Sequence, residues 1–385
     1  MRVIQVVHGA FHHFDLAREL EARGHLQRIY SGFPWHRLQR EGVSRDRVAT
    51  FPWVHTSLFL LERYWRMPRT LKAWLDYQDT LLLDRWVASQ IGPCDAVIGL
   101  SGAALKTGKQ VQGCGGKYVC DRGSSHIRYQ QSIVSEEHRL WGLEAQVTDA
   151  RLIHREESEY AAADAITVPS EFARVSFIEM GVPATKVFKV PYGVSLSRFR
   201  PGNPPSTESF DILFAGTVCL RKGVPYLLQA FHMLKHPHKR LRIVGTVEPG
   251  TLTVLQRLGL QSVELLGSLP QEKLAEYMSA SHVMVLPSIE EGLALVQAQA
   301  MACGCPLISS VNTGGEDLFQ DGVEGFLVPI RDPAAIHARL EQLAADPELQ
   351  KRMSAAALAR VKGLGGWTDY GEKYTRFLTA LIHPH

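Results

Sequence analysis

The sequence predicts an α/β protein made of two doubly wound, Rossmann-like domains that face each other across a cleft. Its 385 residues exceed the size of one ordinary core and fit two domains. Apolar runs of strand length alternate with helical patterns along most of the chain, which is typical of parallel sheets covered by helices on both faces. A breaker-rich stretch at residues 201–206 separates two such series and has the composition of a linker.

The first series predicts an N-terminal domain over residues 1–195. Its expected strands are residues 3–8, 26–30, 96–100, 117–120 and 165–168. Its expected helices include residues 15–24 and an amphipathic helix at residues 149–163 that leads into the last of these strands. The chain then crosses toward the second domain near Tyr192 and Gly193.

The second series predicts a C-terminal domain over residues 196–366. Its expected strands are residues 212–215, 241–244, 263–266, 283–286 and 306–309, with helices between them. Ligands of open α/β sheets bind beyond the carboxyl ends of the strands. Two such sheets of similar size therefore predict a binding cleft between the domains.

Composition narrows the class of protein. A net charge of +3 is too small to favour a nucleic-acid partner. The six cysteines are scattered without a CxxC pair, which is typical of reduced thiols in the cytosol. The chain begins with a strand pattern in place of a signal peptide, and no run approaches the ~20 apolar residues that span a bilayer. We therefore expect a cytoplasmic protein that binds no nucleic acid.

Residues 33–75 are locally basic and rich in aromatic residues. The cations outnumber Glu41, Asp46 and Glu62 by eight to three, a local charge of +5. The cations are Arg37, Arg40, Arg45, Arg47, Arg63, Arg66, Arg69 and Lys72, and the aromatic residues include Trp35, Phe51, Phe59, Trp53, Trp65 and Trp74. This mixture suits peripheral contact with the inner face of a membrane or with a lipid-linked acceptor. The alternative is a basic, partly buried helical insertion.

The turn that begins at Glu291 is the most informative local feature. An apolar run at residues 283–287 delivers Glu291 and Gly292 to a tight turn, and a helical pattern follows. Free amides at a helix N-terminus attract phosphate, whereas the Glu291 carboxylate suits sugar hydroxyl groups. A diphosphate joined to a sugar satisfies both. The alternative is an ordinary strand, turn and helix with a solvated glutamate.

A second glycine turn supplies positive charge. Gly216 follows the strand at residues 212–215, and Arg221 and Lys222 stand at the start of the next helix. Backbone amides and two cations together suit a polyanion such as a diphosphate. A surface Arg-Lys pair after a βα turn is the alternative.

The N-terminal domain offers two polar clusters at strand ends. Residues 121–126 contain Asp121 and His126 and are dense in groups that hydrogen-bond or transfer protons. The loop after the first strand contains Gly9, which lets backbone approach a ligand, followed by His12 and His13, which we expect to be solvated.

No metal site is expected. Two HxxxH spacings pair His8 with His12 and His232 with His236, but the chain has neither an HExxH nor a DxD motif. The first pair straddles a strand end and a turn, and the second runs into Pro237. We expect Arg221 and Lys222 to supply the charge that a cation supplies elsewhere.

Several motifs occur in an order that resembles one enzyme family. They are residues 168–171, 190–194 with Phe199 and Pro201, Gly216 with 222–223, 266–267, 286–288, the Glu291 stretch, 314–316 and 325–329. In these the chain resembles retaining glycosyltransferases of the GT-B fold, family 4. The resemblance covers most of the chain. It implies transfer of a sugar from a nucleotide diphosphate with retention of configuration, without a cofactor and usually without metal.

The resemblance also implies roles for individual residues. Glu291 would contact the donor sugar, Lys222 would bind the diphosphate with help from Arg221, and His126 or Asp121 would lie beside the sugar. The remaining donor-binding residues would be Gly9, Gly216, Gly292, Leu293, Ala294, Leu295, Val296 and Gln299. A C-terminal helix at about 367–385 would pack back on the N-terminal domain.

Three departures from the family pattern bear on activity. Gln299 stands where the family has a second glutamate on the ribose, and an amide hydrogen-bonds a ribose without charge assistance. Thr217 replaces a common arginine, whose charge Arg221 would supply from farther along the loop. Asp121 occupies roughly the place of the family's histidine, and His126 lies five residues later.

The sequence therefore predicts a retaining glycosyltransferase with a nucleotide-sugar donor, for which UDP is the first expectation from the family. The acceptor would be a glycan, a lipid-linked glycan or a small molecule in cell-surface polysaccharide or glycoconjugate synthesis. One alternative is a catalytically weak, nucleotide-sugar-binding partner subunit, which the Gln299 and Thr217 departures favour. A GT-B-like epimerase, which would turn over donor without acceptor, is a third reading.

Overall fold

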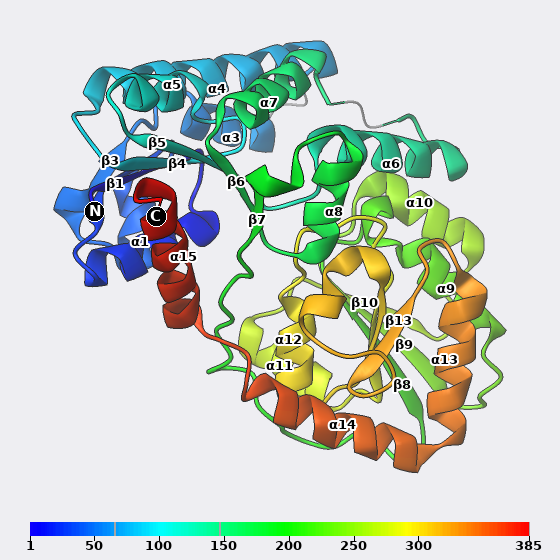
Figure 1. Cartoon of the computed structure of the whole chain (residues 1–385). Coiled ribbons are helices and arrows are strands. Elements are labelled where there is room, and N and C mark those ends of the chain that lie inside the picture. Colours follow the sequence, from blue (N-terminus) through cyan, green and yellow to red (C-terminus); the bar gives the residue numbers. More distant parts are fainter. Residues whose placement is uncertain (65–66, 146–147, 385) are drawn as a thin grey trace.

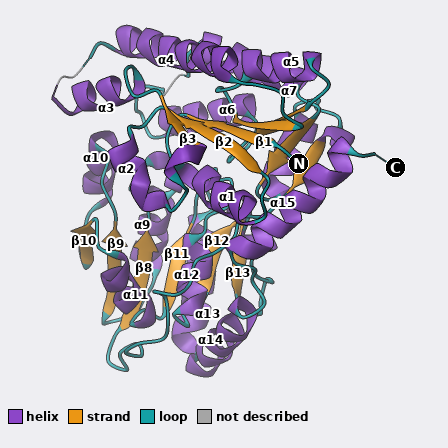
Figure 2. Cartoon of the chain, turned by 90° about the vertical axis from the view of Figure 1, so that its left-hand side faces the viewer, coloured by secondary structure: helices purple, strands orange, loops and turns teal. Residues whose placement is uncertain are grey.

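Two parallel sheets form the framework of the protein (Figures 1 and 2). The computed structural model describes residues 1–64, 67–145 and 148–384. A seven-stranded sheet has the order β3-β2-β1-β4-β5-β6-β7, and a six-stranded sheet has the order β10-β9-β8-β11-β12-β13. Both sheets are doubly wound, because the strand order reverses beside β1 in one and beside β8 in the other. The predicted fold class is confirmed.

The strands follow the apolar runs of the sequence. The first sheet contains β1 (Val3–Val7), β2 (Leu26–Ser31), β3 (Val48–Thr50), β4 (Ala96–Leu100), β5 (Lys117–Asp121), β6 (Ala165–Val168) and β7 (Val187–Lys189). The second contains β8 (Phe210–Ala215), β9 (Lys239–Val244), β10 (Val263–Gly267), β11 (Val283–Leu286), β12 (Leu307–Ser310) and β13 (Gly325–Val328). Central strands such as β1 and β11 are buried along their whole length. Burial on both faces explains why they read as continuous apolar runs without alternation.

Helices cover both faces of each sheet. In the N-terminal half they are α1 (Phe11–Ala22), α2 (Trp35–Leu38), α3 (His55–Tyr64), α4 (Arg69–Gln90), α5 (Leu105–Gly113), α6 (Ile127–Leu140), α7 (Ala150–Ala162) and α8 (Glu171–Glu179). Farther along are α9 (Val224–Met233), α10 (Pro249–Leu258), α11 (Gln271–Ser279), α12 (Val296–Ala302), α13 (Pro333–Ala345), α14 (Pro347–Val361) and α15 (Trp367–Ile382). Helices α4, α5 and α7 cover one face of the first sheet, while α1 and α15 cover the other (Figure 2).

The structure differs from the expected elements mainly at the sheet edges and at α1. Strands β3, β7 and β13 were not expected, because three or four residues at an edge carry little periodic signal. Helix α1 starts at Phe11, four residues before the expected start at residue 15. The tight turn after β1 leads directly into the helix, so His12 and His13 lie on its first turn and not in a solvated loop.

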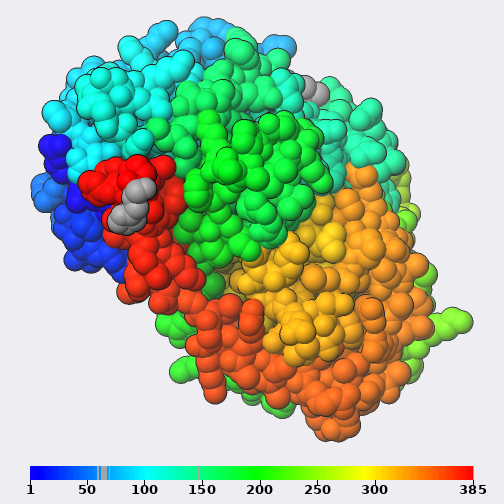
Figure 3. Space-filling model, viewed as in Figure 1, coloured from blue at the N-terminus to red at the C-terminus, as the bar shows by residue number. Residues whose placement is uncertain are grey.

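The chain connects the domains twice at one place. Residues 190–200 lead from β7 to the second sheet, and the segment before α15 leads back; Val194 N–H donates to the Gly365 carbonyl at 3.2 Å. Helix α15 then packs on α1, with Tyr370, Tyr374 and Leu378 buried in the N-terminal core. Figure 3 shows this last helix, in red, against the blue start of the chain. The last helix is therefore part of the first domain's core.

Gly193 marks the closest contact between the two connections. A Cβ atom at this position would lie 2.5 Å from the Trp367 backbone, and backbone cannot move aside as a flexible side chain can. We predict that Gly193→Ala lowers the free energy of unfolding by about 1–3 kcal/mol, the usual cost of overpacking. Urea unfolding measures it. Gly92→Ala is the matched control because nothing lies within 4 Å of its added Cβ. Equal stability of the two variants would contradict the prediction.

Candidate donor pocket and domain interface

A pocket of about 520 Å³ opens at the carboxyl edge of the second sheet. It is lined by Ala215, Gly216, Thr217, Lys222, Val244, Gly245, Thr246, Ser268, Leu269, Leu274, Glu291, Leu293, Ala294, Leu295 and Val296. These residues come from the turns after β8, β9, β10 and β11. Strands that are far apart in the sequence thus contribute to one cavity, as the doubly wound topology predicts.

The two glycine turns singled out in the sequence meet in this pocket. Gly216 and Lys222 come from the first turn, and Glu291 and residues 293–296 come from the second. Gly223 ends the first turn at a φ of +66°, and a Cβ there would lie 1.9 Å from the Pro287 carbonyl oxygen. Only glycine permits both the left-handed conformation and this contact, which holds the turn carrying Lys222 against the turn carrying Glu291.

The Glu291 turn is longer than the sequence suggested. Helix α12 begins only at Val296, so residues 287–295 all lie outside a helix. The Ala294 amide already donates to the Thr313 carbonyl at 3.1 Å. Ala294 is therefore not among the free amides expected at this turn, because its amide is engaged within the protein.

Two cations and two carboxylates meet beside the pocket. Arg221 and Lys222 lie on a short 3₁₀ turn (Leu220–Lys222), and Glu290 and Glu291 follow β11. Lys222 forms a short ion pair with Glu291, and Arg221 Nη1 lies 3.3 Å from Glu291 Oε2. Burial, with Arg221 acting in the same direction, lowers the pKa of Lys222 to about 8. Glu291 is therefore paired with the same two cations, Arg221 and Lys222, that an anionic ligand would bind.

Glu290 points the other way, into the domain interface. Its fully buried carboxylate accepts hydrogen bonds from Ser124 Oγ at 2.5 Å, Ser125 Oγ at 2.7 Å and Gln130 Nε2 at 2.9 Å. Burial opposes its ionisation, but Arg221 and these donors outweigh burial, and the pKa lies below the ordinary value. Sequence reasoning missed Glu290; its signal is a second acidic residue, next to Glu291, in the turn after a buried strand, and such a carboxylate must find partners when it is enclosed.

Backbone contact reinforces this interface. A Cβ at Gly292 would lie 1.9 Å from the Gly123 carbonyl oxygen. The Gly292 carbonyl accepts a hydrogen bond from Ser170 Oγ at 2.5 Å. Gly292 therefore lies between the domains and does not line the pocket. Its place in the interface explains why the position needs glycine.

Asp121 and His126 lie in the interior of the first domain. Asp121 ends β5 and is bonded to His12 Nε2 at 2.6 Å, with Thr167 Oγ1 donating to its other oxygen at 2.6 Å. Burial opposes its ionisation, but His12 and His13 outweigh that effect, so the pKa of Asp121 is well below its ordinary value. Neither Asp121 nor His126 lines the donor pocket.

His126 caps helix α6. Its Nδ1 accepts from the Arg128 amide at 3.2 Å, and its ring packs against Tyr160 and Phe177 at 5.0 Å. Burial lowers its pKa to about 4, so the ring is neutral near neutral pH. His126 Nδ1 therefore already accepts a hydrogen bond from the backbone of its own helix.

The histidines of α1 were wrongly expected to be solvated. His13 is fully buried, and the side chain of His12 is 13% exposed. His12 packs on Tyr192 with ring centroids 4.3 Å apart, and a Cβ at Gly123 would lie 3.6 Å from its ring. His12 therefore reaches the loop that contacts Gly292, and it brings the Asp121 charge to the interface. The early start of α1 is what places it there.

Three other predicted donor residues lie outside the pocket lining. Gly9 follows β1, where an added Cβ would meet the rings of Phe11 and Phe33 at 3.1 and 3.3 Å. Gln299 lies half-buried on α12, and Arg221 reaches the pocket only through its bond to Glu291.

Some pocket residues were missed by sequence reasoning. Thr246 and Ser268 follow β9 and β10, and their hydroxyl oxygens lie 3.0 Å apart. Leu269 and Leu274 add an apolar wall. A polar residue directly after a predicted strand is the signal that could have located Thr246 and Ser268.

Comparison with known proteins identifies the architecture. Sucrose-phosphate synthase from Thermosynechococcus elongatus superposes with a TM-score of 0.73 at 20% identity, covering 99% of both chains. The Anabaena protein HepE in complex with UDP and glucose gives 0.70 at 15% identity, covering 99% of this chain and 100% of that one. Two Rossmann-like domains with a pocket at the facing edge of the second define the GT-B fold, which this chain has.

Sequence comparison adds a family match in the C-terminal half. Residues 197–360 match the family "Glycosyl transferases group 1". A D-inositol 3-phosphate glycosyltransferase of Streptomyces scabiei is 33% identical over 223 residues, which are 52% of this chain and 50% of that protein. A second, from Frankia alni, is 32% identical over 214 residues, 50% of this chain and 52% of that protein. The match thus spans about half the length of these curated relatives.

Glu290 provides a test of the interface. We predict that Glu290→Ala lowers the free energy of unfolding by about 3–5 kcal/mol, because Ser124, Ser125 and Gln130 lose their shared acceptor and Arg221 loses one of its two carboxylate partners. The same variant should increase the radius of gyration in X-ray scattering as the domains separate. Glu264→Ala, which removes a carboxylate that is 48% exposed, is the control and should change neither quantity. A Glu290→Ala variant with unchanged stability and size would contradict this account.

Proposed function

We propose that the protein is a retaining glycosyltransferase of the family 4 type, which transfers a sugar from a nucleotide diphosphate to an acceptor. One observation carries the proposal. A pocket within the group 1 glycosyl transferase region brings together Lys222, Glu291 and the Gly216 turn. Cations and a glycine turn suit a diphosphate, and a carboxylate suits sugar hydroxyl groups.

The Lys222–Glu291 pair supports a donor of this composite kind. A diphosphate that binds Lys222 and Arg221 competes with Glu291 for the same cations. The displaced carboxylate is then available to accept hydrogen bonds from the sugar hydroxyls. Binding of the diphosphate thus releases Glu291 to bind the sugar. Free phosphate lacks the sugar, so it should gain less binding free energy than the full donor.

We take the donor to be a UDP-sugar. HepE, which has the same fold, was solved with UDP and with UDP-glucose. Thr246, Ser268 and Leu269 provide hydroxyl groups and an apolar surface at the far side of the pocket, where a base and ribose would lie. The acceptor belongs to glycans, lipid-linked glycans or small molecules of cell-surface polysaccharide or glycoconjugate synthesis. The curated relatives named for D-inositol 3-phosphate favour a hydroxylated small molecule among these.

The proposed reaction is a front-face substitution. The bond between the anomeric carbon and the β-phosphate oxygen breaks while the acceptor oxygen bonds to the same face of that carbon. Lys222 and Arg221 stabilise the negative charge on the departing diphosphate. They thereby take the role that a divalent cation has in other enzymes. The acceptor proton passes to the departing phosphate oxygen, so no strong protein base is needed. In this proposal His12, which is hydrogen-bonded to Asp121, orients the acceptor.

Lys222 is the residue whose removal tests this proposal. We predict that Lys222→Ala lowers kcat/KM for donor turnover by about 10²–10³-fold, because the lysine meets charge that develops in the transition state. Release of UDP from UDP-glucose with a panel of acceptors provides the measurement. Lys273→Ala, which removes an exposed lysine paired with Glu276, is the matched control and should retain full activity.

A measurement of UDP binding, combined with that turnover assay, distinguishes the alternatives. UDP binding that is equal in excess chelator and in excess Mg²⁺ supports a donor site that needs no divalent cation. UDP binding without turnover of any donor would replace the enzyme by a nucleotide-sugar-binding partner subunit. Turnover of the donor to an isomer without acceptor would indicate an epimerase, and near wild-type kcat/KM in Lys222→Ala would remove the lysine from the mechanism.

We also propose peripheral membrane contact through part of residues 33–75. Phe51 stacks on Trp86 and Arg45 lies over the Trp35 ring, so the start of this stretch belongs to the domain. Farther along, large apolar side chains are exposed on and beside α3 and α4. They are Trp53 (76% exposed), Leu60 (50%), Leu61 (47%), Leu71 (37%) and Trp74 (47%). These residues suit the interface of a bilayer, and the surrounding arginines and lysines suit anionic lipid.

Several residues of this stretch lie outside the described part of the chain. Trp65 and Arg66 are among them, as are the side chains of Phe59, Glu62, Arg63 and Arg69. Within the described residues, no helix is long and apolar enough to cross a bilayer. The proposed contact is therefore a surface contact.

Vesicle binding tests the membrane proposal. We predict that the protein co-sediments with phosphatidylcholine vesicles that contain phosphatidylglycerol, and that Trp53→Ser combined with Trp74→Ser lowers the affinity about tenfold. Leu140→Ser, at a position 58% exposed on α6, is the control and should bind as wild type does. Binding that is absent, or equal in both variants, would sink the proposal.

A further inference from the structure

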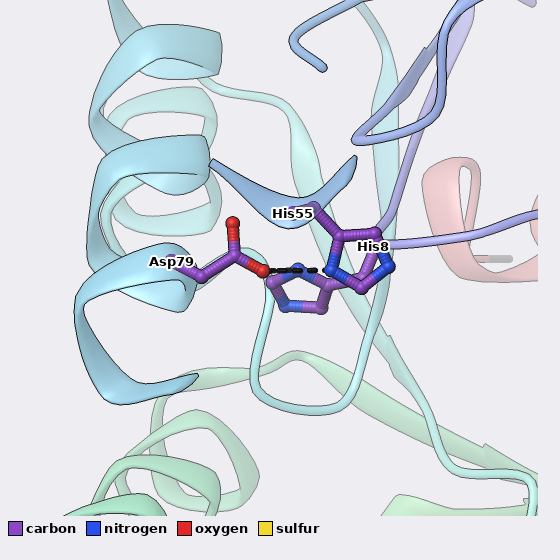
Figure 4. Close-up of side chains that lie close together, drawn as sticks. All are labelled: His8, His55 and Asp79. Carbon is purple, nitrogen blue, oxygen red and sulfur yellow. Dashed lines mark hydrogen bonds and ion pairs between the residues drawn. The ribbon is translucent and has the colours of Figure 1, made fainter. Parts of the chain in front are cut away.

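Two histidines and one aspartate meet at the carboxyl edge of the first sheet, outside the donor pocket. His8 follows β1, His55 begins α3, and Asp79 lies on α4. One ligand atom from each lies within 4.8 Å of the others. Figure 4 shows both rings directed at the Asp79 carboxylate. The HxxxH spacing in the sequence paired His8 with His12, but the fold places these two residues in different clusters.

The contacts inside this cluster leave one polar atom unsatisfied. His55 Nδ1 lies 2.8 Å from Asp79 Oδ2, which is a hydrogen bond. His8 Nδ1 lies 3.7 Å from the same oxygen, too far for one, and it is buried without a hydrogen-bond partner. A buried ring nitrogen without a partner costs stability. Something else at this position would satisfy it.

The geometry points to a divalent metal ion, Zn²⁺ in the first instance, bound by His8, His55 and Asp79. Ligands at the usual Zn–N and Zn–O distances of about 2.0–2.2 Å lie about 3.3 Å apart around a tetrahedral ion. The two separations to Asp79 Oδ2, 2.8 and 3.7 Å, bracket this value. Two of the three ligand separations therefore lie within about 0.5 Å of the value around a bound ion.

The surroundings suit such an ion. Imidazole nitrogens with one carboxylate select zinc or a related transition metal over Mg²⁺ or Ca²⁺, which prefer oxygen. The side chains of His8, His55 and Asp79 are 17%, 29% and 8% exposed, so an ion can enter from solvent. Three protein ligands leave one position for water.

The ion would fasten α3 and α4 to the sheet. Among the described side chains of α3, Leu58 is buried whereas Leu60 and Leu61 are about half exposed, so apolar packing holds this helix weakly. His55 stands at its first residue, and Thr56 Oγ1 donates to the Gly32 carbonyl at 3.1 Å. Coordination by His55 and Asp79 would join both helices to the end of β1. The inference is independent of the proposed sugar transfer, because it concerns a separate site.

Cobalt titration of the full-length protein tests the site. The chain is stripped with a chelator, freed of it, and titrated with Co²⁺. We expect one equivalent to bind with the visible bands of a four-coordinate ion, and Zn²⁺ to displace it. His55→Ala and Asp79→Asn should each weaken Co²⁺ binding by more than about tenfold. His232→Ala, which removes an exposed histidine on α9, is the control and should bind as wild type does.

Two further comparisons make the result decisive. His12, His13 and Asp121 form a second group whose ligand atoms lie close together. Loss of Co²⁺ binding in His12→Ala, with retention in Asp79→Asn, would assign the ion there and overturn the inference. If a variant misfolds, measurements on the wild-type protein test the site instead. Zn²⁺ should protect the backbone amides of α3 from hydrogen exchange and raise the Tm, and absence of both effects or of the four-coordinate spectrum would refute the site.

Discussion

Four charges beside the candidate donor pocket connect the pocket to the domain interface. Arg221 and Lys222 are consecutive on one turn, and Glu290 and Glu291 are consecutive on the turn after β11. Lys222 pairs with Glu291 at the pocket, while Arg221 reaches both carboxylates. Buried charges are costly unless they are paired and hydrogen-bonded. The four groups therefore hold one another, and through them the two turns and the two domains.

Glu290 and Glu291 have different partners because their side chains point to opposite sides. Glu290 faces the first domain and is satisfied by Ser124, Ser125 and Gln130. Glu291 faces the pocket and can exchange its lysine for another partner. The backbone of Gly292 contacts the backbone of Gly123, so the two domains touch at this point. One short segment thus joins the domains through Glu290 and lines the pocket through Glu291.

The sequence predicted the features that depend on local pattern. Buried runs located the inner strands to within about two residues, and the pocket position of Lys222 and Glu291 followed from their places at strand ends. Edge strands such as β3 and β13 were missed, because they are short and gain their stability from a neighbouring strand. The start of α1 was missed because no capping side chain marks it.

Features that depend on contacts between distant residues could not be predicted. Asp121 and His12 are separated by 109 positions, and Glu290 and Ser124 by 166. Neither spacing carries a motif, so the bond between Asp121 and His12 could not be predicted from the sequence. The same reason hid the cluster of His8, His55 and Asp79, whose members come from a strand end and two helices. The residue types indicate that these charged side chains need partners when they are buried. They do not indicate which residues the partners are.

Calorimetry of UDP binding as a function of pH tests the central claim most directly. Lys222 has a pKa of about 8 in the free protein, and a bound diphosphate must raise it, because an opposite charge favours the protonated form. Binding above pH 8 should therefore take up a proton, and UDP affinity should fall by up to about tenfold per pH unit. Lys222→Arg, which stays protonated, should abolish both effects. A pH-independent affinity in the wild-type protein would contradict the assignment of Lys222 to the diphosphate.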